Sequence, residues 1–219
     1  MLAGIALQAW PAAPVAAICL ALVEFITCFD NAVVSLGNRL GISNLNRGLN
    51  RARFFLHAVF IAGLIPAYAG IGRLAGASGF DSTWFNGTVG ALTVGILLFG
   101  YFVGYRPLKR IMPVNYYGCL RYAQAVNANS RRDDYGYSRE ELEQTGAPPF
   151  ASIITVMIGL ILSLWIGFTV GFWLPAIVTA LMMLAGRFPA NARGALATSC
   201  LEIVYSTGIV YSLVSLAGR

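Results

Sequence analysis

The sequence predicts an all-α membrane protein, a polytopic transmembrane bundle of about six helices. Hydrophobic residues make up 58% of the 219 residues and charged residues only 11%, whereas a soluble domain carries roughly 25% charged residues. The mean hydropathy is +0.69, and the polar residues are gathered between long apolar runs. These observations exclude a water-soluble globular protein. In a membrane protein, the net charge of +6 is better explained by basic loops that set the topology than by nucleic-acid binding.

Each predicted helix is an apolar run that fits a hydrocarbon core about 30 Å thick, which takes roughly 20 residues. The uncharged stretch 151–186 is too long for one helix, and Gly171 followed by Pro175 indicates a turn that opens a second one. That second helix is short enough to be re-entrant instead of crossing the bilayer. The six predicted spans are residues 12–37, 54–75, 87–105, 151–169, 173–186 and 195–217.

The spans divide the chain into two membrane units joined by a polar segment. Residues 1–105 form a three-helix membrane unit, residues 106–149 a cytoplasmic loop, and residues 150–219 a second three-helix membrane unit. Within the loop, Ser138 and Glu141 have the spacing of a capping box and predict a short helix. We interpret the loop as a solvated connection, with a docking site for other subunits as the alternative.

The distribution of basic residues predicts the orientation. Arginines follow the first span, occur in the 106–149 loop, and separate the fifth and sixth spans at Arg187 and Arg193. Six crossings place all of them on the cytoplasmic side, with both termini extracytoplasmic. We expect an integral protein of the bacterial inner (cytoplasmic) membrane, or of an organelle membrane derived from it. The 38–53 loop, with its four arginines, is expected at the interface near anionic headgroups.

Acidic residues inside the membrane are the main functional signal. Six of the nine acids lie in loops, but Glu24 and Asp30 fall in the first span and Glu202 in the sixth. A charge at bilayer depth costs at least about 2.5 kcal/mol, so such residues usually line a pathway or pair with one another. We expect no Lys or Arg deep in any span, so a cation or protons should balance these carboxylates.

Helical geometry predicts which polar residues share a face in the first span. At 100° per residue, Thr27, Asn31 and Ser35 lie within about 60° of Glu24 and form one polar stripe. Asp30 lies about 120° away, so only a local unwinding there would bring both carboxylates to one point, as in the broken helices of transporters.

The sixth span carries a matching polar face. Ser199, Glu202 and Ser206 lie on one side of the predicted helix, with Tyr205 at its edge. Two polar-faced helices, the first and the last, therefore predict a shared centre.

Carboxylates, an amide oxygen and hydroxyls are hard ligands, which suit Mn²⁺, Mg²⁺ or Ca²⁺ better than Zn²⁺ or Cu⁺. Two structural alternatives remain open. In one, the acids are protonated and only lock helices together through hydrogen bonds. In the other, one acid pairs with Arg73 or His57. The candidate ligands of a divalent cation are Glu24, Asp30, Asn31 and Glu202.

The same residues carry a resemblance to a known family. The stretch Leu-Val-Glu-Phe-Ile-Thr-Cys-Phe-Asp-Asn-Ala-Val-Val over residues 22–34 resembles the first signature of the TerC-like membrane proteins, in which a Glu is followed six residues later by Asp-Asn. The similarity covers roughly residues 15–75. The family's second signature has a Glu followed by Asp three and nine residues later. Here Glu202 is kept, and Tyr205 and Tyr211 stand at the two Asp positions.

The resemblance implies export of a divalent metal such as Mn²⁺, or a role in metal and envelope stress. Our leading hypothesis is therefore a TerC-like membrane protein that binds and exports a divalent cation, exchanging it against protons on the carboxylates. The second hypothesis is a non-catalytic structural or assembly subunit of a larger membrane complex, derived from a TerC-like ancestor and contacting its partners through the 106–149 loop and helix faces. We expect no enzyme, because the chain has no HExxH, GxSxG, P-loop or histidine cluster.

Overall fold

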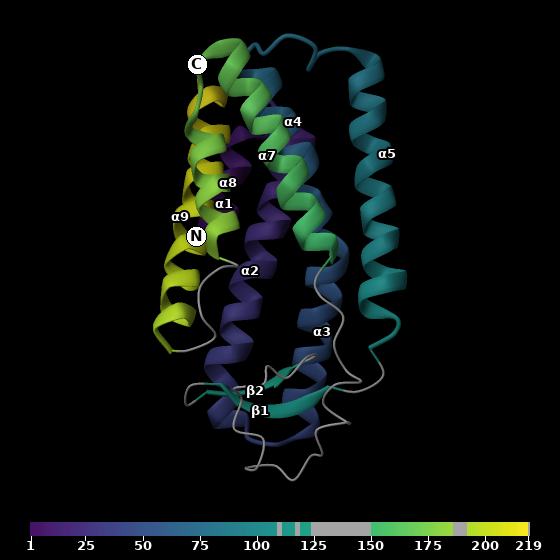
Figure 1. The fold of residues 1–219 in the computed structure, drawn as a ribbon, viewed down its shortest axis with the longest axis vertical. Coiled ribbons are helices and arrows are strands. Elements are labelled where there is room, and N and C mark those ends of the chain that lie inside the picture. The colour runs from purple at the N-terminus through teal and green to yellow at the C-terminus, as the bar shows by residue number, and fades with distance from the viewer. Residues whose placement is uncertain (109–110, 117–118, 124–149, 186–191, 219) are drawn as a thin grey trace.

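The computed structural model describes residues 1–108, 111–116, 119–123, 150–185 and 192–218. This part of the chain is a helical bundle with one small two-stranded sheet at one end (Figure 1). Five helical segments are long and apolar enough to cross a membrane. The all-α membrane bundle predicted from composition is therefore confirmed in outline.

The first span begins with a proline and ends with a glycine. A short helix α1 (Leu2–Ala6) and the 3-10 turn η1 (Leu7–Ala9) come before α2 (Pro14–Leu40). Pro14 suits the first turn, where its missing N–H has no partner to lose, and Gly41 ends the helix with φ of 60°. Helix α2 is continuous through Asp30, so the local unwinding that would bring Asp30 to the same point as Glu24 is not seen there.

The second span starts earlier than predicted. Helix α3 (Asn44–Phe60) begins after Ser43, whose hydroxyl accepts a hydrogen bond from the Asn46 N–H. It continues through the 3-10 turn η2 (Ile61–Gly63) into α4 (Leu64–Leu74). Most of the segment expected to be a basic loop is therefore helical, because the Ser43 cap offsets the low apolar content of the first turns.

Helix α5 (Thr83–Phe99) is also capped by a serine, Ser82, and continues as a π-helical stretch, η3 (Gly100–Tyr105). It lies at the edge of the bundle (Figure 1). Only 17% of its most apolar window is buried inside the protein, the smallest share of the five long segments. Most of α5 therefore lies on the outer surface of the bundle.

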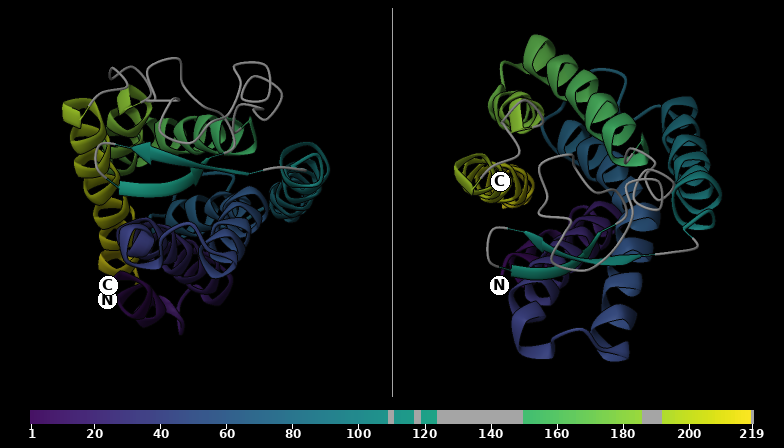
Figure 2. Two further views of the ribbon diagram at one scale, coloured as in Figure 1. Left: turned by 90° about the horizontal axis from the view of Figure 1, so that it is seen from below. Right: turned by 60° about the horizontal axis from the view of Figure 1, so that its bottom comes forward.

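Residues 112–116 and 119–123 form a hairpin within the segment predicted to be a cytoplasmic loop. Strands β1 (Met112–Tyr116) and β2 (Cys119–Ala123) pair antiparallel, with Met112 opposite Ala123. Figure 2 shows the hairpin beside the ends of α2 and α3, and β2 contacts both helices. The capping box predicted at Ser138 lies outside the described residues.

The second half confirms the predicted break. Helix α7 (Phe150–Val170) ends at Gly171, which has φ of 72°, and α8 (Leu174–Ala185) follows. The 12 residues of α8 extend about 18 Å, which is less than the thickness of the hydrocarbon core. Helix α9 (Ala192–Ala217) completes the bundle. Five of the six predicted crossings are thus long helices, and the remaining one, α8, is short.

The core lies between α2, α4 and α9. Leu20, Ile65, Ile209 and Leu213 are fully buried there. At Gly70 a side chain would collide with Ala16 of α2, so this glycine allows α2 and α4 to approach closely. Helix α4 contacts both α2 and α9, so this packing positions the two helices that carry the polar faces.

Candidate functional site

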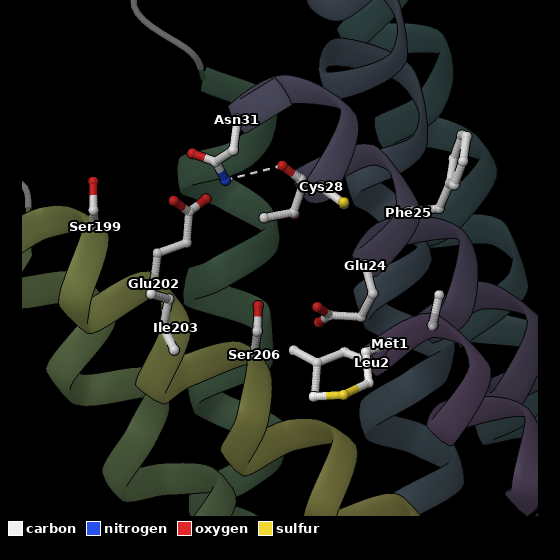
Figure 3. A pocket seen from close by; sticks show the side chains of 12 residues that line it. Met1, Leu2, Glu24, Phe25, Cys28, Asn31, Ser199, Glu202, Ile203 and Ser206 are labelled. Atoms are coloured by element: carbon white, nitrogen blue, oxygen red, sulfur yellow. Dashed lines mark hydrogen bonds between the residues drawn. The ribbon is translucent and has the colours of Figure 1, made fainter. Parts of the chain in front are cut away.

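A cavity of about 350 Å³ opens between α2, α9 and the N-terminal segment (Figure 3). The two predicted polar faces meet here, as the sequence indicated. The cavity is lined by Met1, Leu2, Ala3, Glu24, Phe25, Thr27, Cys28, Asn31, Ser199, Glu202, Ile203 and Ser206.

Helix α2 contributes the predicted stripe. Glu24, Thr27 and Asn31 all line the cavity. The Asn31 side-chain NH₂ donates to the Thr27 carbonyl at 3.0 Å, and the Ser35 hydroxyl donates to the Asn31 carbonyl at 2.8 Å. Because the side-chain nitrogen of Asn31 donates to the Thr27 carbonyl, the side-chain oxygen Oδ1 is the atom that could bind a cation.

Helix α9 contributes the facing groups, Ser199, Glu202 and Ser206. In Figure 3 the Glu24 carboxylate points across the cavity toward the Ser206 hydroxyl, while the Glu202 carboxylate extends toward Asn31. One carboxylate from each helix thus faces the same space.

Burial makes these two carboxylates costly as free anions. Glu24 is only 6% exposed, and Glu202 is half-buried. Two like charges in a water-poor site repel each other, and each also loses hydration. The cavity therefore requires positive charge, supplied either by protons or by a metal cation.

The fourth predicted ligand lies elsewhere. Asp30 does not line the cavity; its Oδ1 is 2.8 Å from Nε of Arg53 on α3. Arg53 was expected in the basic loop before the second span, but it belongs to the first turns of the long helical segment 44–74 and is 7% exposed. The structural alternative in which an acid pairs with a basic residue thus applies to Asp30: its short contact is with Arg53, and its charge also acts on His57.

A buried hydroxyl cluster lies beside the cavity and was not predicted. The Tyr68 hydroxyl lies 2.5 Å from Oγ1 of Thr179 and donates to the Tyr205 hydroxyl at 3.0 Å. The cluster joins α4, α8 and α9. Tyr205 thus takes part in contacts between helices. Tyr211, the other tyrosine singled out in the sequence, is 62% exposed.

The chemistry of the cavity is that of a small oxygen site. It offers two carboxylates, one amide oxygen and three hydroxyls, which are hard donors suited to Mn²⁺, Mg²⁺ or Ca²⁺. Among the described residues, no group of three or more His, Cys, Asp or Glu side chains is placed to hold one metal ion. A cation here would therefore use Glu24 and Glu202 together with neutral oxygens.

Comparison of the chain with protein-family models, with curated proteins and with solved structures found no match.

Proposed function

We propose that the chain is a TerC-like integral membrane protein that binds a divalent cation, such as Mn²⁺, between α2 and α9 and exports it. The observation that carries the proposal is the pair Glu24 and Glu202, which face one cavity from two different spans. The first TerC-like signature supports it, because Glu24 and Asn31 of that signature both line the cavity.

The charge balance favours a divalent ion. The acids within the long helical segments are Glu24, Asp30 and Glu202, and Arg53 neutralises Asp30. The remaining two negative charges match one divalent cation or two protons. Exchange of one for the other would let Glu24 and Glu202 cycle between ion-bound and protonated states without leaving free charge in the bilayer.

The depth of the site also suits transport. Glu24 is ten residues into α2, or about 15 Å from its start at 1.5 Å per residue. Glu202 is fifteen residues before the end of α9, or about 22 Å. The first distance corresponds to the middle of a core about 30 Å thick, where transporters hold their ions, and the second also lies within that core.

The ends of the bundle favour one orientation. Three tryptophans lie toward the end that holds the connection between α4 and α5, as expected for an interfacial aromatic belt. Exposed arginines lie at the opposite end, beside the hairpin, which the positive-inside rule places in the cytoplasm. The inner membrane of a bacterium, or an organelle membrane derived from it, fits this distribution. The tryptophans are Trp84, Trp165 and Trp173.

A structural or assembly subunit is the second candidate. The observation that favours it is the engagement of Tyr205 with Tyr68 and Thr179, which gives the helix face of the second signature a packing role. Purification in mild detergent distinguishes the two functions, because a subunit should co-purify with stoichiometric partners and a transporter should run as a monomer or small homo-oligomer.

Flux measurements test the transport proposal. Proteoliposomes containing the full chain are loaded with Mn²⁺ and its release is followed with an external fluorescent chelator. We expect E24Q and E202Q to reduce release to the level of empty vesicles, and D81N, which changes an exposed acid in a connection, to leave it unchanged. Equal release by the wild type and both Glu variants would refute the proposal.

A further inference from the structure

A second charged feature of the molecule plays no part in the cation site. Three exposed arginines, from three parts of the chain, belong to element ends on the hairpin side of the bundle, and we refer to them as the arginine face. They are Arg39 near the end of α2, Arg47 in the first turns of α3, and Arg106 after η3.

Helix lengths place this face at the depth of lipid headgroups. The segment 44–74 has 31 residues and extends about 46 Å, roughly 16 Å more than the hydrocarbon core. The excess corresponds to about three helical turns. The far end of this segment is apolar as far as Gly72, and its polar residues are concentrated in the first turns, so the excess falls on the stretch that contains Arg47. Helix α2, with 27 residues, likewise carries Arg39 beyond the core.

The hairpin and two buried asparagines hold this region in a fixed arrangement. Asn46 donates to the Gly41 carbonyl at 2.8 Å, and Asn50 donates to Asn46 Oδ1 at 2.8 Å. Oδ1 of Asn50 then accepts from the Tyr122 N–H of the hairpin at 3.3 Å. The Arg47 guanidinium lies 5.9 Å from the centre of the Tyr122 ring. Arg47 is thus held at the surface by a cation–π contact.

The charge of the face is not balanced by the acids of the described residues. Asp30, the one described acid near this end of α2, is already paired with Arg53. Asp81 lies in the connection at the opposite end of the bundle, and Glu24 and Glu202 line the cavity. The face therefore presents several positive charges at headgroup depth.

We propose that the arginine face binds the phosphate groups of anionic phospholipids in the leaflet on the hairpin side. Arginine guanidinium groups donate paired hydrogen bonds to phosphate oxygens, and basic residues near an anionic leaflet gain affinity from its surface potential. This interaction is independent of the cation site, because none of the three arginines lines the cavity.

Lipid titration of the purified full-length chain tests the proposal. Delipidated protein in detergent is titrated with phosphatidylglycerol, with phosphatidylcholine or with inorganic phosphate, and binding is followed by native mass spectrometry. We expect binding of phosphatidylglycerol only. R39Q/R47Q should weaken it by about 25-fold, roughly fivefold for each arginine near the surface. R39K/R47K should retain most of the affinity, and R73Q, which removes an exposed arginine from the opposite end, should not change it.

Three results would overturn the proposal. Phosphatidylcholine binding as tightly as phosphatidylglycerol would remove the role of charge. Equal occupancy by inorganic phosphate would indicate a soluble anion as the ligand. Unchanged affinity in R39Q/R47Q, with the variant folded by its thermal transition, would show that these arginines face another partner, such as an acidic protein segment.

Discussion

The Asp30–Arg53 ion pair gives the most discriminating prediction, because the sequence places Asp30 in the cation site and the structure places it outside. The perturbation is a double-mutant cycle of D30N, R53Q and the combined variant, which separates the interaction between the two side chains from their individual effects. The site explanation and the ion-pair explanation predict opposite behaviour for the combined variant.

The magnitudes follow from burial. The Arg53 side chain is 9% exposed and that of Asp30 is 33% exposed. Breaking a fully buried pair costs about 3–5 kcal/mol. Because Asp30 is partly solvated, we expect about 2–3 kcal/mol for D30N, which leaves the buried guanidinium unpaired, and about 1–2 kcal/mol for R53Q. The combined variant should recover part of the loss, giving a coupling energy of about 1–2 kcal/mol.

Two assays complete the experiment. Unfolding in detergent, followed by tryptophan fluorescence, gives the free energies, and calorimetric titration gives the Mn²⁺ affinity of each variant. We expect the Mn²⁺ affinity of D30N/R53Q to be within about threefold of that of the wild type, which is a change below about 0.7 kcal/mol. Loss of Mn²⁺ binding in D30N/R53Q, to the extent seen in E24Q, would refute the assignment of Asp30 to the ion pair.

Two further predictions concern stability. Y205F removes a buried hydroxyl that accepts from Tyr68; it should cost about 1 kcal/mol of unfolding free energy with unchanged Mn²⁺ affinity, and a loss of affinity would instead make Tyr205 part of the site. G37A should force the hairpin away from α2, because a side chain at Gly37 would collide with the Leu120 carbonyl. It should cost about 1–3 kcal/mol and speed proteolysis near the hairpin, while G48A, at an exposed helical position with open space, should be neutral or stabilising by up to about 1 kcal/mol. Equal behaviour of the two glycine variants would contradict the packing of the hairpin on α2.

Local periodicity accounts for what the sequence predicted correctly. The polar stripe of Glu24, Thr27 and Asn31 follows from the helical repeat alone, and it indeed lines the cavity. The turn between α7 and α8 follows from Gly171 and Pro175, whose backbone preferences are local.

Long-range partners account for what was missed. Arg53 precedes an apolar run and was therefore assigned to a loop, but the Ser43 cap extends the helix and brings the guanidinium to Asp30. Nothing in the spacing of Asp30 and Arg53 along the chain indicates this contact.

The hairpin carried a signal that was not used. Strands 112–116 and 119–123 are separated by only two residues, a separation short enough for antiparallel pairing in a hairpin. Its docking depends on distant groups, including Asn38, which accepts from the Leu120 N–H at 2.6 Å. Such pairing across about 80 residues is set by tertiary packing and not by local sequence.

The proposed cation site requires Glu24 and Glu202 to hold one divalent cation together between α2 and α9. Equilibrium binding of Mn²⁺ to the purified full-length chain, measured by calorimetric titration for the wild type, E24Q/E202Q and the control D81N, tests it most directly. We expect one Mn²⁺ per chain for the wild type and for D81N, and no binding for E24Q/E202Q. One Mn²⁺ bound with unchanged affinity in E24Q/E202Q would contradict it.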